Sequence, residues 1–427
     1  MSDIDVSPIL ENLRSLVLNF NNFDLKHSVL NAQTSGLAKK LDNQYAALII
    51  KRLLRFLLVS GSNTNSSEKE LHLTYIKVLA SASREQLECY ARLPSTSGIV
   101  FGASERSLGV NFSLLGNGIL DLAIHAETTN FALVPVMLSL RHALELPLTG
   151  LRIVFDGPKP MYARVNRETL LLYGSCGQLQ GELLIKENTS NISGLRVEKL
   201  RQLRNSKISI AIDDVPLLEM FPSEEVATRS AALDIELNVN QVNHFANYLE
   251  EGLVLLGDHW SEGYADVIAC VQRTMPLASN GTMDPLNLSV HALRGLVATA
   301  PRGSYLSAQL LAHESGHNRL STIIDLFPLI LNNENEQFYS PFVKAMRSPY
   351  ALLHGIFAFT RDLEITRRMR GRVTELPGYS LDKYYVKLRD NLSSALVTAR
   401  KMRYTRAGTQ VLEGCEAAFE SFPTLPH

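Results

Sequence analysis

The sequence predicts an α+β protein that is largely helical, with a β-rich segment in its middle. Apolar residues recur at helical spacing towards both ends of the chain, whereas short apolar runs broken by glycine, serine and asparagine fill the stretch between them. This change divides the chain into a helical N-terminal region over 1–93, a β-rich segment over 94–220 and a helical region over 221–427. With 427 residues, 45% of them hydrophobic and 20% charged, the chain can bury a sizeable core.

Three stretches of the N-terminal region follow a helical period. The first carries apolar residues on one face from Ile9 to Phe20, the second runs from Tyr45 to Leu58, and the third from Glu68 to Arg92. A polar stretch over 61–67 separates the last two. The region contains no catalytic pattern, so we expect a scaffold or a surface for a partner.

The middle segment contains short apolar runs that are typical of strands, with turn residues between them. These runs are Gly98–Phe101, Leu151–Phe155, Thr169–Tyr173, Glu182–Lys186 and Lys207–Ile212. The stretch Leu120–Leu146 is predicted to form one or two helices. We therefore expect a sheet layer that is preceded by helices.

The last region returns to a helical period from Asn238 to Trp260 and on to Val271. A strand is predicted over Leu293–Thr299, followed by a helix that begins near Ser304 or Ser307 and ends at about Leu326, before Pro328. A further helix is expected from Tyr350 to Met369.

Charge and cysteine content exclude several classes of function. The net charge of −1 and the isoelectric point near 6.8 predict no general attraction to nucleic acid or to an anionic membrane. The four cysteines form no CxxC pair, which argues against a thiolate zinc site and fits a reducing compartment. An acidic N-terminus and the lack of a long apolar stretch lead us to expect a cytoplasmic protein.

The predicted helix over 304–326 carries a His-Glu-x-x-His motif. His313 and His317 are four residues apart, so both imidazoles lie on one helix face and can reach one metal ion, with Glu314 beside them. The motif predicts a metal site in a zincin-like helical region. Two such ligands serve either zinc hydrolysis or iron redox chemistry, depending on the remaining ligands.

The third ligand must come from further along the chain. A metzincin has glycine and histidine where this chain has Leu320 and Ile323, so that class is excluded. The next helix offers His354, which would complete an all-imidazole set, and Glu364, which would give a carboxylate ligand. We favour His354, because an imidazole among apolar neighbours needs a partner and Gly355 permits close approach of a helix.

A series of blocks resembles the family of HExxH-motif peptide-modification proteins. The blocks are His313–Leu320, Ile324–Leu329, Phe338–Pro341, Arg347 and Leu352–Phe359, with weaker similarity at Ile210–Asp214 and Trp260–Tyr264. The resemblance spans roughly 205–370 and is strongest over 305–362. In many members a histidine stands where this chain has Phe359, and a glutamine where it has His354, so the third ligand here departs from that pattern.

This resemblance implies an oxygenase that uses iron(II), Fe(II), and 2-oxoglutarate. Members accompany clusters for ribosomally synthesised, post-translationally modified peptides, and the implied reaction hydroxylates the β-carbon of a residue in a precursor peptide. Such a site needs open metal positions and a cation for the distal carboxylate of 2-oxoglutarate. The candidates for that cation are Arg347, which matches an arginine of the family, and Arg361, seven residues beyond His354.

The alternative is a zinc metallopeptidase in which Glu314 is the general base. In the oxygenase, Glu314 would only orient a histidine or a water. A third possibility is a peptide-binding partner with a degenerate site. The sequence indicates neither the peptide nor the oligomeric state.

Overall fold

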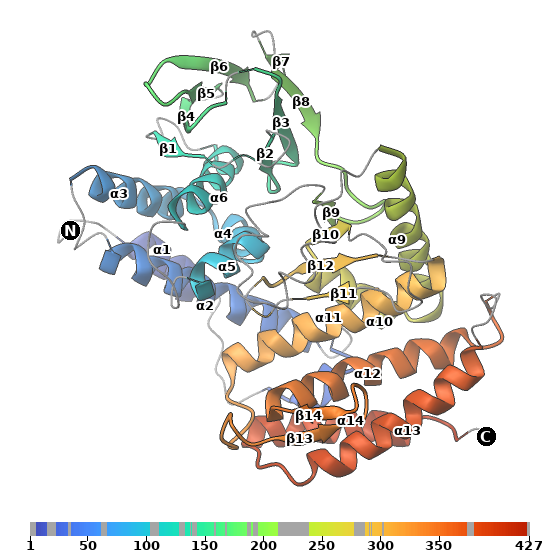
Figure 1. The fold of residues 1–427 in the computed structure, drawn as a ribbon. Helices are drawn as coiled ribbons and strands as arrows, with labels where there is room; N and C mark the ends of the chain where they lie inside the picture. Colours follow the sequence, from blue (N-terminus) through green and yellow to red (C-terminus); the bar gives the residue numbers. More distant parts are fainter. Residues whose placement is uncertain are drawn as a thin grey trace.

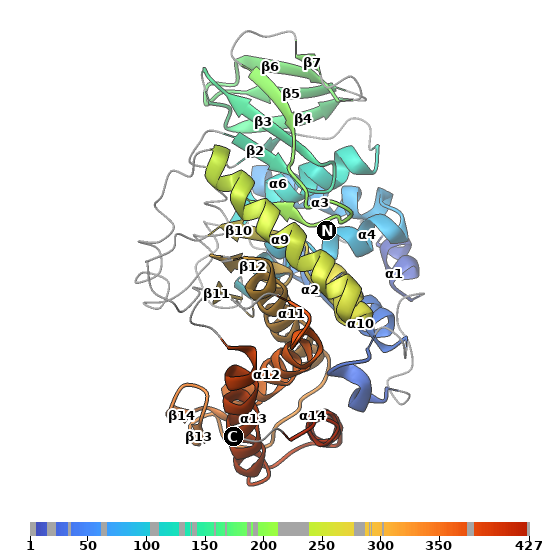
Figure 2. The same ribbon diagram turned by 90° about the vertical axis from the view of Figure 1, so that its right-hand side faces the viewer.

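The computed structural model has the mixed α+β class that the sequence predicts, with many helices and several small sheets, of which the antiparallel ones formed by β1 to β8 lie at one end of the molecule (Figures 1 and 2). The structure describes residues 6–14, 23–32, 36–60, 66–102, 111–127, 133–136, 138, 143–157, 159–166, 169–185, 189–190, 195–211, 239–276, 287–289, 291, 293–300, 303–373 and 380–424. Residues 212–214, which belong to the similarity block at Ile210–Asp214, lie outside this set.

The N-terminal part is helical and extends beyond residue 93. Its elements are α1 (Ser7–Arg14), η2 (Leu25–Ser28), α2 (Leu37–Ser60), α3 (Ser66–Ser81), α4 (Arg84–Ala91), α5 (Pro94–Gly102) and α6 (Asn111–His125). The strand predicted over Gly98–Phe101 is wrong, because these residues lie in α5, which packs against α2 and α6. A short apolar run that is buried on several sides fits a helix as well as a strand.

Antiparallel sheets follow. One sheet has the order β1-β4-β5-β6-β7, formed by Val134–Pro135, Tyr162–Asn166, Thr169–Tyr173, Leu179–Leu184 and Thr189–Ser190. The other has the order β2-β3-β8, formed by Ala143–Leu146, Leu151–Phe155 and Leu195–Lys199. The helices predicted over Leu120–Leu146 are correct only up to His125, because residues 143–146 pair with β3 as strand β2. Strand pairing overrides the helical spacing of a short segment there.

A third sheet supports the motif helix. Its order is β11-β12-β10-β9, formed by Asn287–Leu288, Leu296–Thr299, Arg273–Pro276 and Ser209–Ile210. The strands β12, β10 and β9 are parallel, and β11 is antiparallel at the edge. The strand predicted before the motif helix is confirmed as β12.

The helices of the C-terminal part are α9 (Val239–His259), α10 (Ser261–Cys270), α11 (Ser304–Leu326), α12 (Pro349–Met369), α13 (Leu381–Ala399) and α14 (Arg406–Glu420). The first four lie close to the predicted spans, whereas no separate span was predicted for α13 or α14. A hairpin of β13 (Phe338–Ser340) and β14 (Ala345–Arg347) precedes α12. Helix α11 packs against α9 on one side and α12 on another, so the motif helix lies in the interior of this part (Figure 2).

The N-terminal region shares its cores with the rest of the chain. One core joins α2, from Tyr45 onwards, and the helices α3 to α6 to the antiparallel sheets. A second core joins Leu25, Leu37 and Leu41 to α11, α12, α13 and α14. A third lies between α9, α10, α11 and the parallel sheet. Within the described residues, no helix is both long and apolar enough to cross a membrane.

Candidate metal centre

Helices α11 and α12 cross at Gly316, inside the motif. A Cβ atom at Gly316 would lie 2.7 Å from Cδ of Arg361 and 3.4 Å from Cα of Ala358. The motif therefore needs glycine here so that α12 can approach. The expected role of Gly355 in helix approach is wrong, because a Cβ atom there would meet the ring of Phe342, at 3.1 Å from its Cδ2.

The structure brings the three predicted histidines together. The Nε2 atoms of His313 and His317, on successive turns of α11, are 3.1 Å apart. His354 of α12 lies on the other side of His317, with 3.2 Å between the two Nδ1 atoms. All three side chains are partly exposed, although the residues around them in both helices are mostly buried. The imidazoles thus form one accessible cluster.

Asp362 orients the first histidine of this cluster. Its Oδ2 atom lies 3.0 Å from Nδ1 of His313, and because a carboxylate only accepts, Nδ1 carries the proton of this hydrogen bond. That tautomer leaves Nε2 of His313 facing His317. A carboxylate that holds the outer nitrogen of an imidazole in this way is the usual second partner of a metal-bound histidine.

The histidine pair of α11 fits two ligands of one metal ion. With metal–nitrogen bonds of about 2.0–2.1 Å, two ligating nitrogens lie about 3 Å apart. His354, in contrast, faces the other nitrogen of His317, and within the described residues no three His, Cys, Asp or Glu side chains form a ready coordination group. The arrangement therefore offers Nε2 of His313 and Nε2 of His317 to one metal ion, whereas His354 would have to rotate to join them.

Two of the imidazoles are neutral at ordinary pH. Burial, together with the charges of His313 and His354, holds the pKa of His317 well below its usual value. Burial and the charges of His291 and Arg294 lower the pKa of His354 to about 3. A neutral imidazole offers the lone pair that a metal ion requires.

His313 carries the proton of the cluster. Burial lowers its pKa, but the charge and hydrogen bond of Asp362 and the charge of Glu314 outweigh this and raise the pKa to about 9. With both nitrogens protonated, His313 can donate to His317, and His317 can donate to His354. Glu314 itself is buried, with 4% of its surface exposed.

Phe359 stands beside the cluster, at the position where the similar family has histidine. Its ring centre is 4.8 Å from that of His313, and it stacks on Phe342 with ring centres 4.2 Å apart. Position 359 thus lies next to the first motif histidine, whereas position 354 lies next to the second. Both positions of α12 reach the cluster from opposite sides.

The two predicted arginines lie in different environments. Arg347 ends the hairpin strand β14 and is exposed; its side chain makes no hydrogen bond or ion pair with the described residues. Arg361 is 1% exposed and donates to the carbonyls of Val29 and Ala312 and to Ser315. The assignment of Arg361 to 2-oxoglutarate is therefore wrong, because its guanidinium is bound by groups of the protein.

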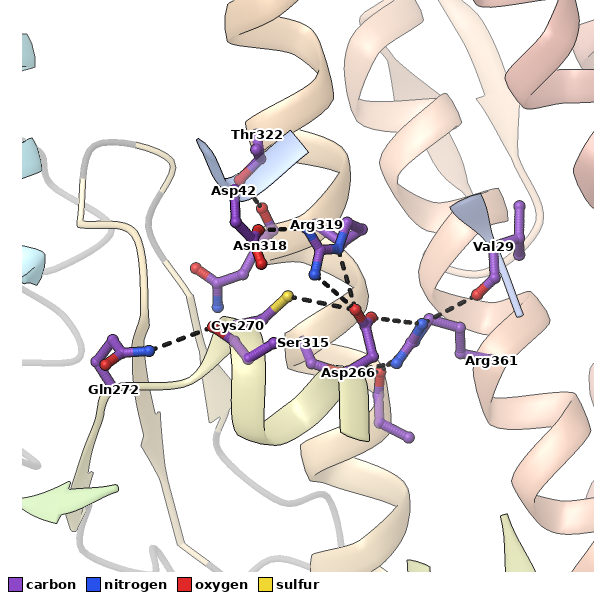
Figure 3. A network of polar contacts seen from close by, with 12 residues as sticks. Val29, Asp42, Asp266, Cys270, Gln272, Ser315, Asn318, Arg319, Thr322 and Arg361 are labelled. Atoms are coloured by element: carbon purple, nitrogen blue, oxygen red, sulfur yellow. Dashed lines mark hydrogen bonds and ion pairs between the residues drawn. The ribbon is translucent and has the colours of Figure 1, made fainter. Parts of the chain in front are cut away.

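Arg361 belongs to a buried ionic network with Asp266 and Arg319 (Figure 3). Asp266 of α10 pairs with Arg361 at 3.0 Å and with Arg319 at 2.7 Å, and Arg319 also reaches Asp42 of α2 at 2.6 Å. Burial raises the pKa of Asp266, but the two guanidinium charges outweigh burial and lower it overall. This network fixes α2, α10, α11 and α12 relative to one another.

Glu364, the alternative third ligand, points away from the histidines. Its carboxylate binds Arg367 at 2.8 Å and also Arg368, both in the next turn of α12. Asp325, at the end of α11, forms an ion pair with Arg294 at 2.5 Å and contacts His291 at 3.2 Å. Neither acid belongs to the cluster.

Sequence reasoning missed two residues near the cluster. Asp362 lies in a predicted helix, but its contact with His313 depends on how α11 and α12 cross. His291 precedes the motif, and its ring centre lies 6.5 Å from that of His354. In the sequence, only the position of Asp362 among apolar residues of a predicted helix could have indicated its role. No feature of the sequence indicated a role for His291.

Comparison with known proteins adds no relative. No model of a known protein family matches the chain, and a search of the curated proteins finds no match.

Proposed function

We propose that this protein is an iron(II)- and 2-oxoglutarate-dependent oxygenase that hydroxylates the β-carbon of a residue in a ribosomally synthesised precursor peptide. The observation that carries the proposal is the convergence of His313, His317 and His354, with His313 oriented by Asp362. The similarity of 305–362 to HExxH-motif peptide-modification proteins supports the choice of chemistry. A zincin-like arrangement of α11 and the parallel sheet is part of the proposal.

In this proposal the histidines hold the metal and the aromatic wall excludes water. Iron would supply oxidation by O₂, with 2-oxoglutarate as the co-reductant that is converted to succinate and CO₂. Asp362 fixes the tautomer of His313 so that Nε2 faces the metal position. Phe342 and Phe359 shield the His313 side of the cluster.

The exposed Arg347 remains our candidate for a carboxylate partner. It ends the hairpin whose turn carries Phe342, and α12, the helix of His354, begins two residues later. An arginine without a protein partner can offer both ends of its guanidinium to a carboxylate. The distal carboxylate of 2-oxoglutarate is the carboxylate that this proposal assigns to it.

A zinc metallopeptidase is the second candidate, and one observation favours it. Glu314 is buried beside His313 and raises the pKa of that histidine, so its charge is close to the metal position. A carboxylate in that place can take a proton from an attacking water. In the oxygenase no attacking water is deprotonated, so the same carboxylate has no role as a base.

The first experiment separates these two functions. The protein is loaded anaerobically with iron(II) and 2-oxoglutarate, then exposed to air with a precursor peptide encoded by a neighbouring gene. We expect the peptide to gain the mass of one oxygen atom, with one succinate formed for each product. Zinc-dependent cleavage of the peptide, without added oxygen, would overturn the oxygenase proposal.

Variants sharpen the result. His313→Ala and His317→Ala should abolish metal binding and turnover, and His354→Ala should lower both; the exposed His244 provides the control His244→Ala, which should change neither. Retained metal content and turnover in His354→Ala would show that the third ligand is another residue. Glu314→Gln should retain hydroxylation in an oxygenase and lose nearly all cleavage in a peptidase.

A further inference from the structure

The side chain of Gln309 lies one turn of α11 before His313, where α11 meets α12 and α13. Positions four apart share one face of a helix, so Gln309 and His313 lie on the same face of α11. Helix α13 packs against α12 (Figure 1), and Gln309 is only 8% exposed. A primary amide in such surroundings needs hydrogen-bond partners, because an unpaired buried polar group destabilises the fold.

Both partners of the Gln309 amide lie on other helices. Its Nε2 atom donates to the hydroxyl oxygen of Tyr384, on α13, at 2.6 Å. Its side chain also forms a hydrogen bond with Asp362, on α12. Because a carboxylate only accepts, the amide turns Nε2 towards Asp362, and the two hydrogens of Nε2 are enough for both partners.

Asp362 is therefore bound by two side chains from successive turns of α11. Its Oδ2 atom accepts from Nδ1 of His313 at 3.0 Å, and Gln309 bonds it from the turn before. Burial raises the pKa of Asp362, whereas the charge and hydrogen bond of His313 and the hydrogen bond of Gln309 lower it. The bond from Gln309 thus favours the ionised carboxylate, which is the form that accepts from His313.

The contacts connect α13 to the metal centre through a chain of side chains. The chain runs from the half-buried Tyr384 through Gln309 and Asp362 to His313. A carboxylate with one hydrogen bond can pivot about it, whereas a second bond from a fixed donor restricts its orientation. The donor is fixed here because the Gln309 amide is itself bound to Tyr384.

We propose that Gln309 and Tyr384 are positioning residues of the metal centre, which hold Asp362 in the orientation that fixes the tautomer of His313. Nε2 of His313 is then directed towards the metal position beside His317. This role rests on the metal centre of the proposed function, but not on whether its metal is iron or zinc. Gln309 and Tyr384 act only through Asp362.

The proton on Nδ1 of His313 reports on this role directly. In full-length protein with ¹⁵N-labelled histidine, its NMR signal is identified by its loss in His313→Ala, and its exchange with water is measured without metal and with zinc. Gln309→Met keeps the length of the side chain but removes the amide. We expect faster exchange and an upfield shift of the signal in Gln309→Met, and smaller changes in the same direction in Tyr384→Phe.

Metal affinity provides a second measurement. In titrations with cobalt(II), the Kd should rise by about tenfold in Gln309→Met, the lower end of what the loss of an outer partner of a ligand costs. The matched control is Tyr305→Phe, which removes a buried hydroxyl of α11 that lies 3.0 Å from Oγ1 of Thr366 on α12, two turns from His313. This control should lower stability without changing proton exchange or the affinity for cobalt(II).

Unchanged exchange and unchanged cobalt(II) affinity in both Gln309→Met and Tyr384→Phe would overturn the proposal and leave these residues a structural role only. If Gln309→Met does not fold, the half-buried Tyr384→Phe decides by the same two measurements. The result is distinct from that of the proposed function. A protein that hydroxylates no peptide can still show both effects, and an active oxygenase can lack them.

Discussion

Asp362 is expected to make metal binding at the proposed centre dependent on pH. It holds a proton on His313, whose pKa is raised to about 9, and a metal ion must displace that proton. We expect the apparent affinity for zinc or cobalt(II) to fall about tenfold for each pH unit below 9, as far as neutral pH, because one proton is released on binding. Equilibrium titrations at several pH values measure this slope.

The variant Asp362→Asn tests the cause of that slope. The amide keeps an oxygen for Nδ1 of His313 but lacks the charge that raises its pKa, so the slope should vanish near neutral pH. The affinity at high pH should fall by about 10–100-fold, which is typical of the loss of such a partner. Asp258→Asn, on the exposed side of α9, is the control. A slope that persists in Asp362→Asn would assign the proton to another group.

The individual site residues differ in how far the sequence could predict them. His313 and His317 follow from a local pattern, because a helix fixes the distance between positions four apart. The role of Arg361 could not be predicted, because its helical position does not show whether it faces solvent or Asp266. The contact of Asp362 with His313 joins two helices across 49 positions and depends on their register.

At the scale of elements, the crossing of α11 and α12 depends on one glycine. In Gly316→Ala the new Cβ atom would lie 2.7 Å from Cδ of Arg361, a side chain held by four protein groups, so it cannot move aside freely. We expect the free energy of unfolding to fall by about 1–3 kcal/mol, as in other overpacked cores. Urea unfolding measures the change, and metal affinity should fall with it.

Gly257→Ala is the matched control for this substitution. Gly257 also lies inside a helix, α9, but its Cβ atom would meet only the ring of Tyr264, at an ordinary 3.9 Å. Alanine is the better helix former, so this variant should gain about 0.5–1 kcal/mol. A stabilising Gly316→Ala would show that the two helices are not held as closely as described.

The elements themselves were predictable where their pattern was long. The spans of α9, α11 and α12 follow from apolar periodicity over about five or more turns, which tertiary contacts do not override. The short runs were not decisive: Gly98–Phe101 became helix and Ala143–Leu146 became strand. A run of only four residues can form a helix or a strand, and the elements packed against it decide which. A single sequence does not show which elements these are.

At the scale of the whole molecule, Asp121 joins the N-terminal helices to the sheets. It lies in α6 and accepts from the backbone N–H groups of Leu148 and Thr149, in the turn between β2 and β3. Burial raises its pKa from 3.8 to about 7, despite these hydrogen bonds. The folded state therefore keeps the proton over a pH range in which the unfolded chain has lost it.

This shift predicts that stability is lost as the pH rises. The contribution of the protonated Asp121 is complete below about pH 4, falls as the pH rises towards 7 and is absent above it; the total is on the order of a few kcal/mol. Urea unfolding across this range should show the loss in the native protein and not in Asp121→Asn. An equal slope in both proteins would show that other groups control it.

The N-terminal region is expected to be necessary for the fold of the metal centre. Asp42 binds Arg319 and the carbonyl of Val29 binds Arg361, and both arginines are almost completely buried. A chain that begins at residue 94 leaves the two arginine charges with fewer partners and removes part of two cores. The combined loss of stability should exceed the free energy of unfolding of about 5–15 kcal/mol that is typical of a folded protein. The truncated chain should lack near-UV circular dichroism and cooperative unfolding.

A shorter deletion separates this explanation from a general effect of truncation. A chain that begins at residue 23 loses α1 but keeps Leu25, Val29, Leu37 and Asp42, so it should unfold cooperatively and still bind metal, with reduced stability because the buried Ile9 is gone. Metal binding by the chain that begins at residue 94, at the affinity of the full protein, would show that the centre folds without α2. The structure predicts the opposite, because the ionic network that fixes α11 against α12 also includes α2.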